Sequence, residues 1–226
     1  MNRGAEQKPG EVRPPGQEGQ GARYTTFTRG EDGKALLQVT ELRGDKLHGD
    51  SVLLSPQGQE VQRASFYDGV LDGEVVRNGE DGQVVLRQHY QEGKLHGEML
   101  VYSMGKVRLR QTYAFGLLEG PMLVYSETGR VGVEVPFKSG KRQGDAKYFT
   151  PEGLLFRCEP YVDDKLHGEV FEYDERGAVR KRTVFQAGAQ KDSPVLFDER
   201  GRETKKSREP PFIVKLAKLL RKPLGG

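Results

Sequence analysis

The sequence predicts an all-β protein: an elongated single-layer antiparallel sheet of stacked 24-residue β-hairpin repeats, with a short C-terminal capping helix. The first observation behind this prediction is a five-residue word, GKLHG, at residues 93–97, which recurs as DKLHG at 45–49 and 164–168. The second is the spacing, because degenerate copies of the word lie between and after these three, and every step measures 24 residues except one of 23. A fixed period of this length indicates a repeat architecture.

Two kinds of residue keep the period. The last glycine of each word, here called the anchor, is followed by a strand, and from the second word on an aromatic residue stands seven positions before it. The anchors are Gly49, Gly73, Gly97, Gly120, Gly144 and Gly168, with Asp192 in the seventh place. The aromatic residues are Phe66, Tyr90, Tyr113, Phe137, Tyr161 and Phe185. We assign both sets structural roles.

The repeats divide the chain into three parts. Residues 1–22 are rich in Gly, Pro, Glu and Gln and nearly lack large apolar residues, which predicts a disordered tether. Residues 23–202 hold the hairpin repeats, including a partial first unit. Residues 203–226 hold a linker and an amphipathic helix between prolines, with Phe212, Leu216 and Leu219 on its apolar face. We favour a cap over the last sheet edge, and contact with a membrane is the alternative.

Each repeat reads as two strands and two turns. A strand such as EMLVY follows the anchor, and a turn such as DERG, SETG or TPEG follows the strand. The second strand, for example QVVLRQHY, alternates apolar and polar residues as a half-buried strand does. The word then reverses the chain. Its first glycine suits a turn position with positive φ, and its second suits a place where a neighbouring side chain or backbone comes close.

The histidines and the single cysteine do not form a site in this scheme. His48 and His96 are two repeats apart, or roughly 20 Å at the usual strand spacing, which is too far for a shared metal ion. We therefore assign the histidines no partner and expect His96→Ala to cost little. Cys158 has no histidine at adjacent repeat positions to activate it. The sequence predicts no catalytic residue, no metal site and no cofactor.

The pattern resembles the MORN repeat, in particular its bacterial variant. The match is carried by an aromatic residue, Gly-Lys, the anchor, a strand ending in Tyr and a turn glycine, as in Tyr90, Gly93, Lys94, Gly97 and Tyr102. It covers about residues 40–202. Eukaryotic MORN repeats usually carry a second glycine two residues after the anchor, and this chain does not, which fits the bacterial variant. The resemblance implies an elongated curved sheet used as a recognition surface, and an antitoxin-like or immunity-like role.

Composition favours a binding protein over an enzyme. The chain has a net charge of only +3 and 35% hydrophobic residues, and it contains no phosphate-binding glycine loop or catalytic triad. The charge is too weak and too dispersed to predict nucleic-acid binding. We expect a non-enzymatic module that binds another protein, such as a toxin that it neutralises. The alternative is a peripheral membrane or phospholipid-binding scaffold. No apolar run resembles a signal peptide, so the chain as written is expected in the cytoplasm, or in the periplasm if Met1 replaces a removed signal.

A column of arginines is the candidate partner-binding surface. The fifth residue after the turn glycine is arginine in four of six full repeats, at Arg63, Arg87, Arg110 and Arg182. Strand alternation places this column on the face opposite the aromatic residues. Arginines in a row could contact carboxylates of a partner or phosphates of a lipid. The competing interpretation is that they pair with nearby acids such as Glu74, Glu98 and Glu169.

Overall fold

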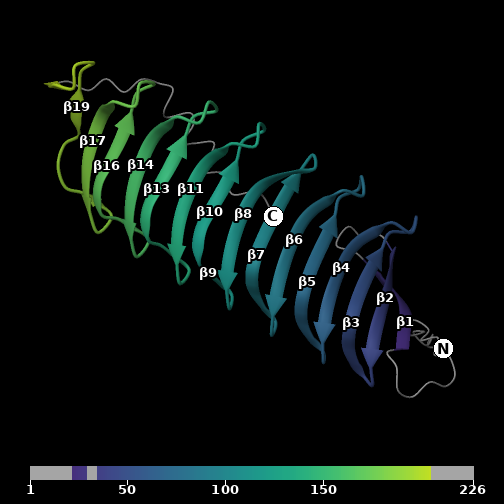
Figure 1. Ribbon diagram of the computed structural model, residues 1–226. Coiled ribbons are helices and arrows are strands. Elements are labelled where there is room, and N and C mark those ends of the chain that lie inside the picture. The colour runs from purple at the N-terminus through teal and green to yellow at the C-terminus, as the bar shows by residue number, and fades with distance from the viewer. Residues whose placement is uncertain (1–21, 30–34, 205–226) are drawn as a thin grey trace, which may run out of the picture.

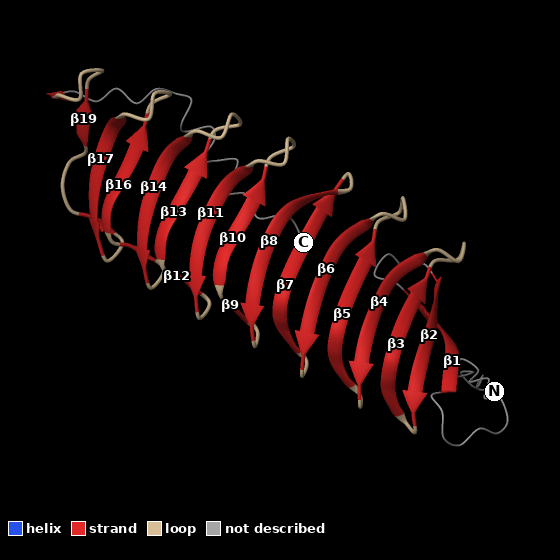
Figure 2. Ribbon diagram, in the orientation of Figure 1, coloured by secondary structure: helices blue, strands red, loops and turns tan. Residues whose placement is uncertain are grey.

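The computed structural model describes residues 22–29 and 35–204, and within them the chain forms one open antiparallel sheet of 20 strands (Figures 1 and 2). Each longer strand pairs with the longer strands before and after it in sequence, so the hairpins follow one another along an elongated ribbon. The predicted all-β sheet is confirmed. The predicted capping helix lies outside the described residues, as does the tether apart from Ala22, which begins the first strand. Residues 203–204, assigned to the linker, form the last strand.

The strands form two sets according to their place relative to the words, and β1 and β20, at the two ends of the sheet, are given with the first set. The strands before the words are β1 (Ala22–Arg29), β2 (Ala35–Arg43), β4 (Glu60–Tyr67), β6 (Val84–Gln91), β8 (Lys106–Ala114), β11 (Val131–Lys138), β14 (Leu155–Val162), β17 (Val179–Gln186) and β20 (Glu203–Thr204). The strands within and after the words are β3 (Lys46–Leu54), β5 (Val70–Asn78), β7 (Lys94–Ser103), β9 (Leu117–Leu118), β10 (Gly120–Tyr125), β12 (Lys141–Arg142), β13 (Gly144–Phe149), β15 (Lys165–Leu166), β16 (Gly168–Tyr173), β18 (Ala189–Gln190) and β19 (Val195–Phe197).

The first glycine of the word lies in a two-residue turn, as predicted. Between β4 and β5 the turn residues are Asp68 and Gly69, with φ of 50° and 86°. Two successive residues with positive φ are typical of the type I′ turn, whose twist matches that of a β-hairpin. The opposite edge carries longer turns. Gly58, for example, donates its N–H to the carbonyl of Ser55 at 2.9 Å and has a φ of 80°.

The anchor glycine lies in a bulge. Ala64 pairs with Val75 and Phe66 with Leu71, so residues 72–74 of β5 stand opposite Ser65 alone. The extra residues bend the strand and force positive φ at the anchor, which is 116° at Gly73. In the later repeats the same irregularity divides the strand, producing the two-residue strands β9, β12, β15 and β18. Joining these four to the strands that follow leaves 16 of the 20 strands, against about fifteen predicted from the repeat count.

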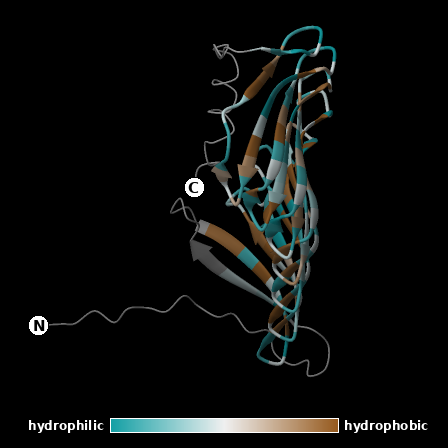
Figure 3. Ribbon diagram, turned by 90° about the vertical axis from the view of Figure 1, so that its left-hand side faces the viewer, coloured by the Kyte–Doolittle hydropathy of each residue, from teal (hydrophilic) through white to brown (hydrophobic). Residues whose placement is uncertain are grey.

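The sheet is one layer thick, so its core is thin. Seen from the side in Figure 3, hydrophobic and hydrophilic residues alternate along the strands and no second layer of described residues covers either face. The buried hydrophobic residues are Ala64, Val75, Val135, Ala146, Tyr161 and Val170. All six belong to the face that also carries the aromatic residues, here called the aromatic face. The opposite face, which carries Arg63, Arg87, Arg110 and Arg182, is called the arginine face.

Candidate binding surfaces

The arginine face holds the predicted column on β4, β6, β8 and β17. Each of the four arginines pairs with an acid on the adjacent strand. The nitrogen-to-oxygen distances are 3.0 Å for Arg63–Asp50, 2.8 Å for Arg87–Glu74, 2.5 Å for Arg110–Glu98 and 3.2 Å for Arg182–Glu169. Arg63 contacts Glu60 as well, at 2.6 Å. Glu134 and Cys158 occupy the equivalent positions between Arg110 and Arg182, so the column is interrupted in the middle of the ribbon.

Because the arginines pair with acids of the chain, the column is less available to bind an acidic ligand. Each arginine has at least one carboxylate within hydrogen-bond range, so the positive charge is largely balanced along the face. The pairs are between about a third and a half exposed, and surface pairs of this kind contribute only about 0–1 kcal/mol each to folding. An acidic partner or a phosphate would have to compete with carboxylates that are already in place.

The word edge shows a contact between repeats that the sequence analysis missed. The imidazole Nδ1 of His96 accepts a hydrogen bond from the backbone N–H of Phe115 at 3.4 Å, and the two rings lie 4.7 Å apart. His48 makes the same contacts with Asp68 and Tyr67. Phe115 has a φ of 48° and begins the turn of the following repeat. The expectation that these histidines have no partner is therefore wrong.

This contact recurs with other side chains at the same place in the word. The carboxylates of Asp72 and Glu119 accept the N–H of the next turn at 3.1 and 2.7 Å, and the amide oxygen of Gln143 does so at 3.1 Å. In addition, the first residue of each word after the first donates its N–H to the preceding word, as Gly93 does to the carbonyl of Leu71 at 2.8 Å. The word edge therefore joins successive turns, and the acceptor rather than the imidazole is the shared feature.

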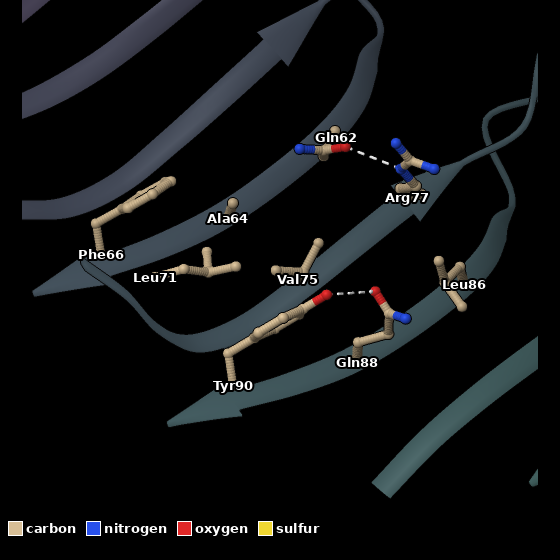
Figure 4. A pocket seen from close by; sticks show the side chains of 9 residues that line it. All are labelled: Gln62, Ala64, Phe66, Leu71, Val75, Arg77, Leu86, Gln88 and Tyr90. Carbon is tan, nitrogen blue, oxygen red and sulfur yellow. Dashed lines mark hydrogen bonds between the residues drawn. The ribbon is translucent and has the colours of Figure 1, made fainter. Parts of the chain in front are cut away.

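A groove with a volume of about 350 Å³ crosses β4, β5 and β6 on the aromatic face (Figure 4). Its lining residues are Gln62, Ala64, Phe66, Leu71, Val75, Arg77, Leu86, Gln88 and Tyr90. Ala64 and Val75 are buried and form the floor. Phe66, Leu71 and Tyr90 lie toward the word edge, whereas Gln62, Arg77 and Leu86 lie toward the opposite edge. The groove thus combines apolar residues, which lie mainly at its floor and toward the word edge, with the polar groups of Gln62, Arg77 and Gln88.

Arg77 is the single charged residue that lines the groove. It is exposed, and its Nε donates to Oε1 of Gln62 at 2.9 Å. Among the described residues Arg77 has no carboxylate partner, in contrast to the four arginines of the opposite face. The terminal amino groups of its guanidinium remain available for a carboxylate, which such a fork binds well. The sequence analysis missed Arg77. The equivalent residues of the other repeats are Leu53, Val101, Val124, Tyr148, Glu172 and Leu196, so an arginine at this position differs from all of them.

The same surface three repeats later is filled by side chains. The positions of Leu71, Arg77, Leu86 and Gln88 correspond to Arg142, Tyr148, Arg157 and Glu159. Glu159 accepts hydrogen bonds from the hydroxyls of Tyr148 and Tyr161 at 2.9 and 2.8 Å and from Nε of Arg157 at 2.6 Å. The Arg142 guanidinium lies 4.1 Å from the centre of the Tyr161 ring.

Burial makes this second cluster a closed, stable network. Glu159 and Tyr161 are each only 8% exposed. Burial, with the Glu159 carboxylate second, raises the pKa of Tyr161 to about 12 and raises the pKa of Tyr148 well above its ordinary value. Both hydroxyls therefore stay protonated and continue to donate to Glu159. The groove on β4–β6 lacks these filling groups and remains open.

The single cysteine, possible metal ligands and possible membrane-spanning helices provide no further candidate site among the described residues. Burial raises the pKa of the Cys158 thiol, which makes the thiolate scarcer. No group of three or more His, Cys, Asp or Glu side chains in residues 22–29 and 35–204 is arranged to hold a metal ion. Within the same residues, no helix has the length and apolar character needed to cross a membrane.

Comparison with known proteins adds no family assignment. No family model matches the chain, and no curated protein sequence is similar to it.

Proposed function

We propose that this protein is a non-enzymatic binding module whose aromatic face receives another protein. The observation that carries the proposal is the single-layer sheet, which leaves the partly exposed aromatic residues of one face, such as Phe66, Tyr90 and Tyr113, without a second layer among the described residues. Large apolar surfaces on soluble proteins mark sites of interaction, and stacked repeats present extended surfaces to their partners. The open groove on β4–β6 is one hollow of this face that such a partner could occupy.

The role of an antitoxin or immunity protein rests on the resemblance to the bacterial MORN-variant repeat. In such a role the sheet would cover the active site or the docking surface of a toxin. A rigid, elongated sheet suits this task, because it loses little conformational freedom on binding. The arginine face, with the column at Arg63, Arg87, Arg110 and Arg182, is the second candidate surface. Its arginines already pair with acids of the chain, so we expect it to contribute little to binding.

The alternative of a phospholipid-binding scaffold has less support. It depends on the C-terminal amphipathic segment, which lies outside the described residues, and on the arginine column. Since each arginine of that column already has an acidic neighbour, the face offers little net positive charge to a phosphate surface. A protein partner therefore suits these surfaces better than a phospholipid.

The test is capture followed by neutralisation. The full chain is used to capture a partner from native cells, the partner is identified by mass spectrometry, and it is then expressed alone and together with this protein. We expect expression of the partner alone to arrest growth and co-expression to restore it. A captured protein whose toxicity or activity is unchanged by a molar excess of this chain would refute the antitoxin or immunity role.

A further inference from the structure

We infer that the groove on β4–β6 is a peptide-binding site, which takes an apolar segment of the partner and holds an adjacent carboxylate at Arg77. The inference deepens the proposed function and rests on it, because it names the chemistry that the partner must present. Three observations carry it: the shape of the groove, the charge of its lining, and the contrast with the filled surface three repeats later.

The floor and walls select the apolar part of the ligand. Ala64 and Val75 are 4% and 7% exposed, so the floor is low and apolar. Phe66, Leu71 and Leu86 are half-buried and stand around it (Figure 4). An aliphatic or aromatic side chain placed on this floor would remove apolar surface from water on both molecules, which is the main favourable contribution to association.

The charge of the lining selects an acidic group as the second part of the ligand. Arg77 is the only ionisable group with a formal charge at neutral pH among the nine lining residues. Gln62 accepts from its Nε and thereby orients the guanidinium plane, leaving the two terminal amino groups for a ligand. A carboxylate that contacts both amino groups forms a bidentate charge-assisted pair. The complement of the groove is therefore an apolar side chain followed by an acidic one.

The filled surface shows how this fold closes the same site. At the corresponding positions Arg142 stacks on Tyr161, and Arg157 and two tyrosine hydroxyls saturate the Glu159 carboxylate. There the carboxylate comes from the chain itself. On β4–β6 the corresponding residue is Gln88, which is uncharged and accepts from the Tyr90 hydroxyl at 3.4 Å. The open site thus carries its arginine at a different position, where the filled surface has Tyr148, and it lacks the internal acid.

The test is a selection of peptides from a random displayed library on the intact protein. Arg77→Ala removes the charge. Leu71→Arg introduces the residue found at the equivalent position, Arg142, and is designed to fill the groove as Arg142 fills the surface three repeats later. Arg180→Ala is the matched control, because Arg180 is likewise an exposed arginine of a strand without a carboxylate partner among the described residues and lies outside the groove. Synthetic copies of the selected peptides are then titrated into each variant.

We expect peptides selected on the parent protein to carry Asp or Glu next to apolar residues. Their affinity should fall by about 10- to 100-fold in Arg77→Ala, the range for loss of a charge-assisted pair. It should fall at least as far in Leu71→Arg and stay within about twofold in Arg180→Ala. No enrichment of acidic apolar peptides, or equal affinity for the parent and Arg77→Ala, would overturn the inference. Either result would leave the proposed function to the capture and neutralisation test, which does not depend on this groove.

Discussion

Gly73 combines a backbone conformation that disfavours side chains with a close contact, so replacing it tests the bulge directly. An alanine held at the φ of this position, 116°, would raise the free energy of the folded state by about 1–2 kcal/mol. A Cβ built there would lie 2.9 Å from Cβ of Ser65, which is fixed to the backbone and cannot rotate away. Overpacking of this kind adds about 1–3 kcal/mol. We therefore expect Gly73→Ala to lower the free energy of unfolding by about 2–5 kcal/mol.

Gly58 provides the control for this prediction. Its φ is 80°, but a Cβ there would meet no atom within 4 Å, so Gly58→Ala should cost only the conformational part, about 1–2 kcal/mol. Urea unfolding followed by circular dichroism measures both variants. Ser65→Gly should recover about 1–3 kcal/mol of the Gly73→Ala loss in a double-mutant cycle. If Gly73→Ala costs no more than Gly58→Ala, or if Ser65→Gly recovers nothing, the account of the bulge is wrong.

Three further predictions follow from the word edge, the arginine face and the cysteine. Loss of the N–H acceptor and ring contact in His96→Ala should destabilise the protein by about 0.5–1.5 kcal/mol, whereas His89→Ala, on an exposed strand position, should stay within about 0.5 kcal/mol; equal urea midpoints would contradict this. The hydrogen bond from Ser65 and the guanidinium of Arg63 hold the pKa of Asp50 below its ordinary value. Its contribution to stability should therefore be complete above the unfolded pKa and disappear as pH falls through the folded one, so the stability gap between the parent and Asp50→Asn should close only in acid; a gap that does not change with pH would refute it. Burial raises the pKa of Cys158, so alkylation at mildly alkaline pH should be slower in the native protein than in urea, and equal rates would count against it.

The architecture could be predicted because each repeat contains the same turn residues and the same alternation of apolar and polar residues. Turn glycines such as Gly69 and Gly93 require positive φ, and alternating strands between them leave few alternatives to stacked hairpins. The bulge at the anchor was not predicted, because the spacing places a glycine but does not reveal that three residues face one across the ladder. The contact from His96 to Phe115 was missed for a related reason, since it joins neighbouring repeats and no single repeat contains both partners.

The binding surface was harder to predict than the fold. The arginine column was visible as a period, and the structure places it on one face as expected, but the pairing of each arginine depends on which acids lie across the strands. Arg77 was overlooked because its position in the repeat holds residues of several types and therefore shows no period. In a repeat protein, regularity identifies the scaffold, and departures such as Arg77 and Glu159 identify where the surface differs from one repeat to the next.

The most direct test of the account compares the two faces of the sheet against the captured partner. Isothermal titration is carried out with the parent protein, with Leu71→Arg on the aromatic face, and with Arg63, Arg87 and Arg110 all changed to Ala on the arginine face, after circular dichroism confirms that each variant is folded. The account predicts that Leu71→Arg weakens binding by about tenfold or more while the triple variant binds within about threefold of the parent, which is under about 0.7 kcal/mol. Loss of binding in the triple variant with full affinity in Leu71→Arg would contradict it and assign the partner to the arginine face.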